Sequence, residues 1–173
     1  MAEEQGFAGF NEGVANGEDT MPQVGMISQY VKDLSFENPN APAVYQWQEQ
    51  PQIEVQFNIG ANVVGEDVHE VALQIQVAAR ADGNTAFAVE LLFAGLFAIR
   101  NVPQEQLQPF LLAEAPRLLF PFARRVIADA IRDGGFPPLI LDPIDFGQLY
   151  MERAAQAQAE LGQSQAPEVT GQA

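Results

Sequence analysis

The chain has 173 residues, of which 47% are hydrophobic and 18% charged, and its 23 acidic against 8 basic side chains give a formal net charge of −15. Nucleic acids and anionic membrane surfaces are therefore poor partners, because proteins bind both through cations. The absence of cysteine excludes disulfides, cysteine nucleophiles and cysteine-ligated zinc. A small chain this apolar and this lightly charged is expected to keep apolar surface for oligomerisation or for a binding groove.

The negative charge is unevenly distributed along the chain. Residues 1–79 hold twelve acidic side chains and a single base, Lys32, whereas residues 80–173 hold eleven acidic side chains and seven arginines. A basic protein partner, or basic stretches in a bound polypeptide, would fit such a field. Solubility alone is the alternative explanation.

Both ends of the chain are expected to lie outside the folded domain. Residues 1–25 are rich in Gly, Glu, Asn and Gln without periodicity, which predicts a disordered acidic tail. Residues 155–173 are expected to form a flexible C-terminal tail, which leaves 26–154 as one domain. The N-terminus lacks the basic start and apolar core of a signal peptide, and no apolar run approaches the ~20 residues of a membrane helix. We therefore expect a cytoplasmic protein that does not insert directly into a membrane.

Four strands are predicted after the N-terminal tail. The first is 27–36, and the Pro-rich stretch that follows it is expected to be an extended crossover. The second strand alternates most clearly, with apolar residues at Ile53 and every second position to Ile59. The third strand is 68–79. The sequence ADGN then predicts a hairpin turn, and the fourth strand starts at Thr85.

The apolar period changes to about 3.6 over residues 104–133, which predicts a long helix. Two neighbouring apolar rows suggest that this helix is buried on more than one side, and Pro116 and Pro121 should kink or divide it. Two glycines end it, and an extended segment then leads to an N-cap at Asp145 and a short second helix. The predicted fold class is α+β: a four-stranded antiparallel sheet with one face covered by a long helix and a short second helix.

The sequence offers little catalytic chemistry. The single histidine, His69, falls on the inward side of the third strand, where a packed residue is commoner than a catalyst. No Gly-rich phosphate loop, GxSxG or HExxH motif is present. Neighbouring acids such as Glu66 and Asp67 are explained as a turn, and metal binding by carboxylates alone needs a denser loop. We predict no enzymatic activity, no cofactor and no metal site.

Aromatic residues on irregular segments are more informative. Tyr45 and Trp47 lie in the predicted crossover, whereas Phe136, Phe146 and Tyr150 surround the second helix. Such aromatics can anchor loops to the core. Alternatively, they can line a groove between crossover and helix that binds many sequences, because apolar contact is not directional.

Three stretches of the sequence carry recognisable motifs: KDLSFENPNAP at 32–42, TAFAVELLFAGLF at 85–97, and residues 118–146. Together they resemble the SecB family of protein-export chaperones. The first is similar to the family's K-D-[IL]-S-F-E-x-P-N-x-P signature. The second is similar to its fourth strand, and the third to its long helix, its G-x-F-P connection and the start of its second helix. The motifs occur in the family's order, and the resemblance covers residues 27–152.

The resemblance implies an ATP-independent holdase, with 26–154 as its chaperone domain. Such a protein keeps preproteins unfolded in the cytoplasm and delivers them to the SecA ATPase of the Sec translocon. It is a homotetramer, a dimer of dimers, with long helices between two eight-stranded sheets. The implied site residues are Asp33, Glu37 and Glu90 for SecA binding; Tyr45, Trp47, Phe146, Leu149 and Tyr150 for client binding; and Val89, Leu91 and Phe93 for the oligomer interface, where core packing is the alternative.

Two other functions stay open at this stage. One is a SecB-like chaperone dedicated to another client, such as a toxin–antitoxin system, which genomic neighbourhood would separate from an export chaperone. The other is an acidic small-molecule-binding module, which a saturable ligand and indifference to unfolded proteins would support.

Overall fold

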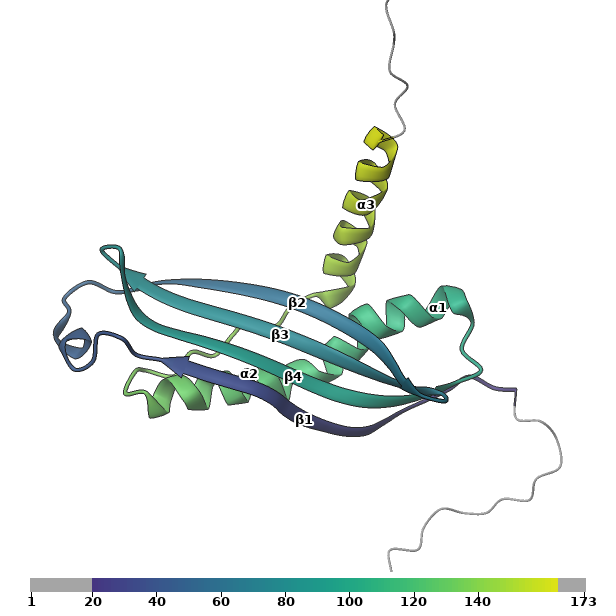
Figure 1. The fold of residues 1–173 in the computed structure, drawn as a ribbon, viewed down its shortest axis with the longest axis horizontal. Helices are drawn as coiled ribbons and strands as arrows, with labels where there is room; N and C mark the ends of the chain where they lie inside the picture. The colour runs from purple at the N-terminus through teal and green to yellow at the C-terminus, as the bar shows by residue number, and fades with distance from the viewer. Residues whose placement is uncertain (1–19, 165–173) are drawn as a thin grey trace, which may run out of the picture.

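Alternating apolar and polar residues build a twisted four-stranded antiparallel sheet (Figure 1). The computed structural model describes residues 20–164. The strand order is β1-β4-β3-β2, so the last three strands of the chain form a meander and the first strand pairs with the fourth at the far edge. The crossover between β1 and β2 therefore spans the width of the sheet. The strands are β1 (Gln23–Glu37), β2 (Gln52–Gly65), β3 (Val68–Ala81) and β4 (Asn84–Arg100).

The two hairpin turns follow their sequence signals. Asp82 and Gly83 both have positive φ angles, 49° and 75°, in the turn between β3 and β4, as ADGN predicts. The turn between β2 and β3 contains Asp67, with a φ of 56°. Both predicted turns are confirmed, and each fixes the register of the strands that it joins.

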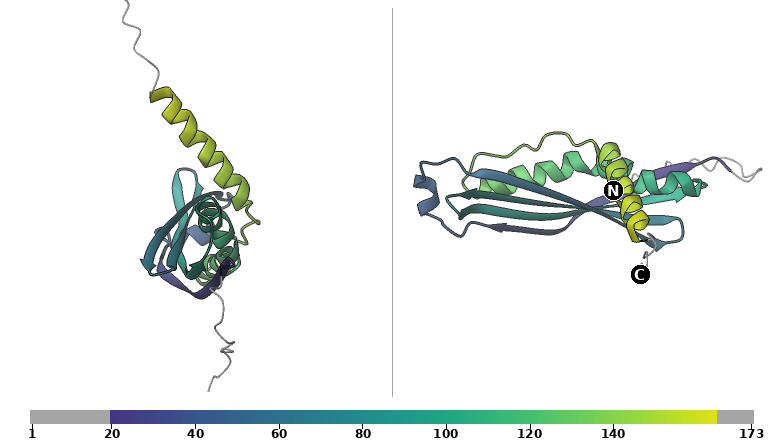
Figure 2. Two further views of the ribbon diagram at one scale, coloured as in Figure 1. Left: turned by 90° about the vertical axis from the view of Figure 1, so that its right-hand side faces the viewer. Right: turned by 90° about the horizontal axis from the view of Figure 1, so that it is seen from above.

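One helix covers the inner face of the sheet, as the end-on view shows (Figure 2). Strands β3 and β4 supply fully buried side chains such as Leu73, Ile75 and Leu91. They pack against one apolar row of α2 (Ala115–Asp133), which is itself buried: Leu119, Ala123, Ile127 and Ile131. The core thus lies between the two central strands and this helix.

The predicted long helix is divided by a π-helical segment. It consists of α1 (Gln104–Pro109), η2 (Phe110–Glu114) and α2. Pro116 lies in the first turn of α2, directly after the π-helical segment, whereas Pro121 lies inside the helix. The expected division is confirmed, although the break falls just before Pro116 rather than at it.

The second helix, α3 (Phe146–Ser164), begins at the predicted cap but is not short. The backbone N–H of Gln148 donates to Asp145 Oδ1 at 2.9 Å, which confirms the cap. Helices α2 and α3 each have 19 residues, so the expectation of a short second helix was wrong. The α3 sequence is rich in Ala, Gln and Glu, strong helix formers, and the helix projects away from the sheet (Figures 1 and 2).

The expected tail boundaries also shift. Strand β1 starts at Gln23, inside the predicted N-terminal tail, and α3 continues through residues 155–164. Residues 1–19 and 165–173, the remainder of the two predicted tails, lie outside the described residues. No helix within 20–164 combines the length and apolarity that crossing a bilayer requires.

Gly134 allows the end of α2 to pack closely on the sheet, which gives a stability test. A Cβ at this position would lie 2.1 Å from Cζ of Phe36, whereas a Cβ at Gly60 would meet nothing within 4 Å. We expect Gly134→Ala to destabilise the fold by about 1–3 kcal/mol through overpacking. The control Gly60→Ala should be neutral or slightly stabilising. Urea unfolding at one protein concentration measures both, and equal stability of the two variants would contradict this packing.

Candidate functional site

Acidic side chains mark the outer face of the sheet, away from α2. Glu90 on β4 pairs in register with Ser35 on β1, while Asp33 and Glu37 pair with the β4 residues on either side of it along the face. The three predicted carboxylates therefore lie on two neighbouring strands and on one face. The resemblance implied all three as site residues, and their role in SecA binding stays a prediction.

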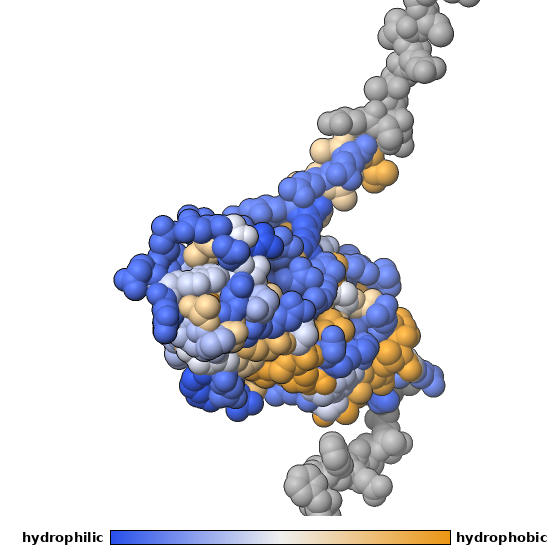
Figure 3. Space-filling model, turned by 60° about the vertical axis from the view of Figure 1, so that its left-hand side comes forward, coloured by the Kyte–Doolittle hydropathy of each residue, from blue (hydrophilic) through white to orange (hydrophobic). Residues whose placement is uncertain are grey.

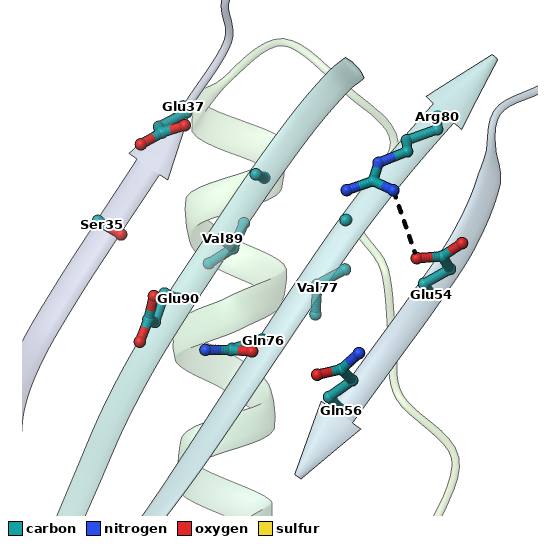
Figure 4. A pocket seen from close by; sticks show the side chains of 11 residues that line it. Ser35, Glu37, Glu54, Gln56, Gln76, Val77, Arg80, Val89 and Glu90 are labelled. Atoms are coloured by element: carbon teal, nitrogen blue, oxygen red, sulfur yellow. Dashed lines mark ion pairs between the residues drawn. The ribbon is translucent and has the colours of Figure 1, made fainter. Parts of the chain in front are cut away.

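A shallow hollow of about 310 Å³ crosses this outer face (Figure 4). Glu37 and Glu90 border one side of it, and the ion pair between Glu54 and Arg80, 3.8 Å apart, borders the other. Asp33 is not among its lining residues. The hollow is open and rich in carboxylates, which suits a basic protein surface better than a buried small molecule.

A buried acid lies on the same face, and the sequence analysis missed it. Glu70 on β3 is only 8% exposed. Lys32 Nζ lies 2.6 Å from Glu70 Oε1, and the Tyr30 hydroxyl donates to Glu70 Oε2. Bonds from Lys32 and then Tyr30 lower the pKa of Glu70, and the bond to Glu70 raises the pKa of Tyr30 to about 12. Because both donors come from β1, two strands away, the contact depended on tertiary pairing.

The predicted client groove is divided into two separate hollows. Half-buried Trp47 lines one of about 280 Å³ beside the β3–β4 turn, together with Glu49 and Asp82. Leu149 and Tyr150 line another of about 220 Å³, where α3 meets the sheet. The two hollows share no lining residue.

Tyr45 anchors the crossover, although half of its surface is exposed. Its hydroxyl donates to the carbonyl of Gly134 at 2.9 Å and accepts from Asn38 Nδ2 at 2.8 Å. Its ring lies 5.5 Å from that of Phe136, which in turn lies 4.7 Å from that of Phe87. This chain of contacts fixes the crossover to the end of α2, so Tyr45 acts as a loop anchor here.

Phe146 lies in the core rather than on a surface. It is 2% exposed, and its ring packs edge-on against Phe120 at 5.7 Å. Its place therefore corrects the expectation that it lines a client groove: it anchors the start of α3. The Leu149 and Tyr150 hollow contains other residues that the sequence analysis did not identify as site residues: Ile59, Leu112, Arg153 and Ala154.

The three residues expected at an oligomer interface belong to the core of the single chain. Val89, Leu91 and Phe93 point inward from β4 and are at most 5% exposed. Only their alternative role, core packing, fits this position, because a side chain already buried under α2 cannot contact another chain.

Apolar surface is exposed elsewhere, and one face shows it in contiguous patches (Figure 3). On α2, Leu118 and Phe122 are 37% and 43% exposed. They lie beside the buried row of α2, which contains Leu119 and Ala123. Edge strand β1 adds five large apolar residues: Val24, Met26, Ile27, Val31 and Leu34.

Within the described part of the chain, no group of three or more His, Asp or Glu side chains is arranged to hold a metal ion. His69 lies on the inner side of β3, opposite Phe97 and half-buried.

The strand order, the crossover and the helix on one face define the fold of SecB-like chaperones. The solved structure of the Mycobacterium tuberculosis Rv1957 SecB-like chaperone, in complex with a ChAD peptide from the Rv1956 HigA1 antitoxin, matches with a TM-score of 0.58. The match covers 70% of this chain and 87% of that one, at 14% sequence identity. The likeness therefore concerns the fold alone.

This chain belongs to the SecB family. The family profile described as "Preprotein translocase subunit SecB" matches residues 17–157. The protein-export protein SecB of Rhizorhabdus wittichii is 66% identical over 165 residues, which cover 95% of this chain and 97% of that relative. The SecB of Zymomonas mobilis is 61% identical over 151 residues, covering 87% and 92%. The resemblance found in the motifs is confirmed.

The Glu70 cluster, formed by Glu70, Lys32 and Tyr30, predicts that the stability of the fold depends on pH. A carboxyl whose pKa is lower in the folded state than its ordinary 4.5 contributes stability above that pH. The contribution is lost as the pH falls through the folded-state pKa. We therefore expect the unfolding free energy of wild type to fall more between about pH 6 and about pH 3 than that of Glu70→Gln. Urea titrations at the two pH values measure this, and parallel curves would contradict it.

Proposed function

We propose that this protein is an ATP-independent holdase that keeps preproteins unfolded and delivers them to the SecA ATPase of the Sec translocon. The observation that carries the proposal is the 66% identity to a protein-export SecB across 95% of the chain. The proposal assigns no catalytic step. It places the protein's work in the cytoplasm, where preproteins are found before translocation.

Client binding is assigned to the two hollows that Trp47 and Tyr150 line. Aromatic or aliphatic burial contributes about 1.5–3 kcal/mol per side chain before ordering costs, so one contact holds a chain weakly. Useful holding therefore needs several hollows occupied by one long polypeptide, through effective concentration. Trp47 in one hollow and Tyr150 in the other are the aromatic contacts that support this assignment.

Repetition of these hollows would come from a homotetramer, a dimer of dimers. Among residues 20–164, strand β1 lies at an edge of the sheet, and it carries exposed Val31 and Leu34. Such an edge is a template for pairing with another chain. The exposed Leu118 and Phe122 of α2 supply a second apolar surface. Together these surfaces support assembly through β1 and α2.

SecA is assigned to the outer face of the sheet. None of Asp33, Glu37 and Glu90 forms an ion pair within residues 20–164, so their charge remains available to a basic partner. Glu90 accepts one hydrogen bond, from Gln74 Nε2 at 2.7 Å, which orients its carboxylate without neutralising it.

A chaperone dedicated to a toxin–antitoxin client is the second candidate. Its support is the fold of the M. tuberculosis chaperone at 14% identity. The far higher identity to export proteins favours general export.

The holding activity can be tested with a slow-folding preprotein. The purified protein should delay refolding at stoichiometric amounts without ATP. Tyr150→Ala should reduce holding by about threefold to tenfold, because one aromatic contact per hollow is lost. Ile140→Ala is the control, since this residue is 68% exposed and lines neither hollow. Light scattering should give about 75 kDa for every variant, four times the 18.8 kDa chain. Equal holding by both variants would remove the α3 hollow from client binding.

Charge reversal tests the SecA surface. Asp33→Lys, Glu37→Lys and Glu90→Lys together should weaken SecA binding by at least about tenfold, and wild-type binding should fall as salt rises. The charge-matched control reverses Glu105 and Asp142, which lie away from the sheet face, and Glu160 on α3. Calorimetry measures both triple variants. Unchanged affinity in the first one would locate the SecA site elsewhere.

A further inference from the structure

Each basic side chain of the four strands forms an ion pair with an acid other than Asp33, Glu37 and Glu90, the residues of the proposed SecA surface. The four strands contain three Lys or Arg residues: Lys32, Arg80 and Arg100. Arg80 lies 3.8 Å from Glu54, and Arg100 Nε lies 3.2 Å from Asp67. Lys32 makes the shortest of these contacts, 2.6 Å to Glu70.

Lys32 is also the cation nearest in sequence to that surface. The register of β1 against β4 shifts between Val31 and Asp33, so Lys32 is the extra residue of a β-bulge. Val31 points to the inner face, while Lys32 reaches Glu70 on the outer face and Asp33 pairs with Leu92 on that same face. The bulge thus places a base and an acid, adjacent in the chain, on one side of the sheet.

We propose that Glu70 is a positioning residue for partner binding, which holds the Lys32 ammonium away from Asp33 and so keeps the acidic face unneutralised. The inference rests on the proposed function of this face. A lysine ammonium on its four-carbon stem moves freely unless it is held. Two features hold it here: Glu70 is buried, and Tyr30 fixes its second oxygen from the same strand. Ala94, the partner of Tyr30 on β4, is small enough for the tyrosine to cross that strand.

Loss of Glu70 would change the face in two ways. It removes one negative charge, and it releases a positive charge beside Asp33. Exposed charges act over about 10 Å at 0.1 M ionic strength, so a released Lys32 would oppose a basic partner directly. Removing one negative charge far from Lys32 would release no positive charge. A variant of that kind therefore separates the positioning of Lys32 from a change in net charge.

The experiment measures SecA affinity by calorimetry for four variants. Glu70→Gln should weaken binding about fivefold, and Lys32→Gln should leave it within about twofold of wild type. The double variant should return to within about twofold, because no cation is released. Glu66→Gln, in the exposed β2–β3 turn, loses the same charge as Glu70→Gln and should also stay within about twofold.

A second measurement does not depend on SecA. The ¹³C chemical shift of the Asp33 carboxyl carbon should change in Glu70→Gln, where the ammonium reaches it, and stay constant in Lys32→Gln. A change in Lys32→Gln would overturn the proposal, because Lys32 would then already contact Asp33. The Asp33 shift in Lys32→Gln can therefore overturn the proposal even if Glu70→Gln does not fold.

The affinity results can overturn the proposal in three ways. Equal weakening by Glu66→Gln and Glu70→Gln would mean that net charge alone acts. If Lys32→Gln bound SecA more tightly by the same factor by which Glu70→Gln bound it more weakly, net charge alone would again explain the affinities. A double variant as weak as Glu70→Gln would mean that Glu70 only supports the fold. If the Asp33 shifts follow the expectation but the triple reversal leaves SecA affinity unchanged, the capture of Lys32 stands and the proposed partner of this face fails.

Discussion

The structure depends on how much of an apolar sheet face one helix can cover. A helix with its side chains is about 10–12 Å wide, and neighbouring strands are about 4.8 Å apart, so α2 covers about two strands. These are β3 and β4, most of whose inward side chains are buried. The inner sides of the edge strands β1 and β2 extend beyond the helix and need other cover.

The two edges obtain that cover differently. On the β2 side, Phe57 packs edge-on against Phe120, which contacts Phe146 at the start of α3, so the chain covers this edge itself. On the β1 side, no comparable element of residues 20–164 covers Val31 and Leu34, which remain exposed. The hollow beside α3 on one side and the exposed apolar residues of β1 on the other both follow from a helix too narrow for its sheet.

Local physics made much of the fold predictable. Strand parity in β2, β3 and β4, the ADGN turn and the Asp145 cap depend on residues close in sequence, and all of these were recovered. The three acids that the family motifs pointed to do share the outer face of the sheet, while their role there stays a prediction.

The failures came from packing between distant segments. Val89, Leu91 and Phe93 were expected at an oligomer interface, but α2 of the same chain packs against their strand and buries them. The length of α3 was underestimated, because its polar face resembles a tail while its helix propensity is high.

The division of the predicted client groove and the Glu70 cluster were missed for the same reason. In both, contacts join residues from strands or helices whose spatial order the sequence does not state. Tyr30 and Lys32 are about forty residues from Glu70 and reach it across an intervening strand. The sequence signal for this cluster was Lys32, the single basic residue among the twelve acidic ones of residues 1–79.

The projection of α3 has a mechanical consequence. The helix is fixed at its start by Phe146 and the Asp145 cap, and Arg153 donates to the carbonyl of Phe57 at 3.0 Å, whereas residues 155–162 are exposed. At 1.5 Å per residue, residues 155–164 form a cantilever about 15 Å long. A tilt of roughly 20° at the anchor would carry its tip about 5 Å, while Tyr150, close to the pivot, would move far less. The free end of the helix could therefore sweep a wide arc without loosening the sheet.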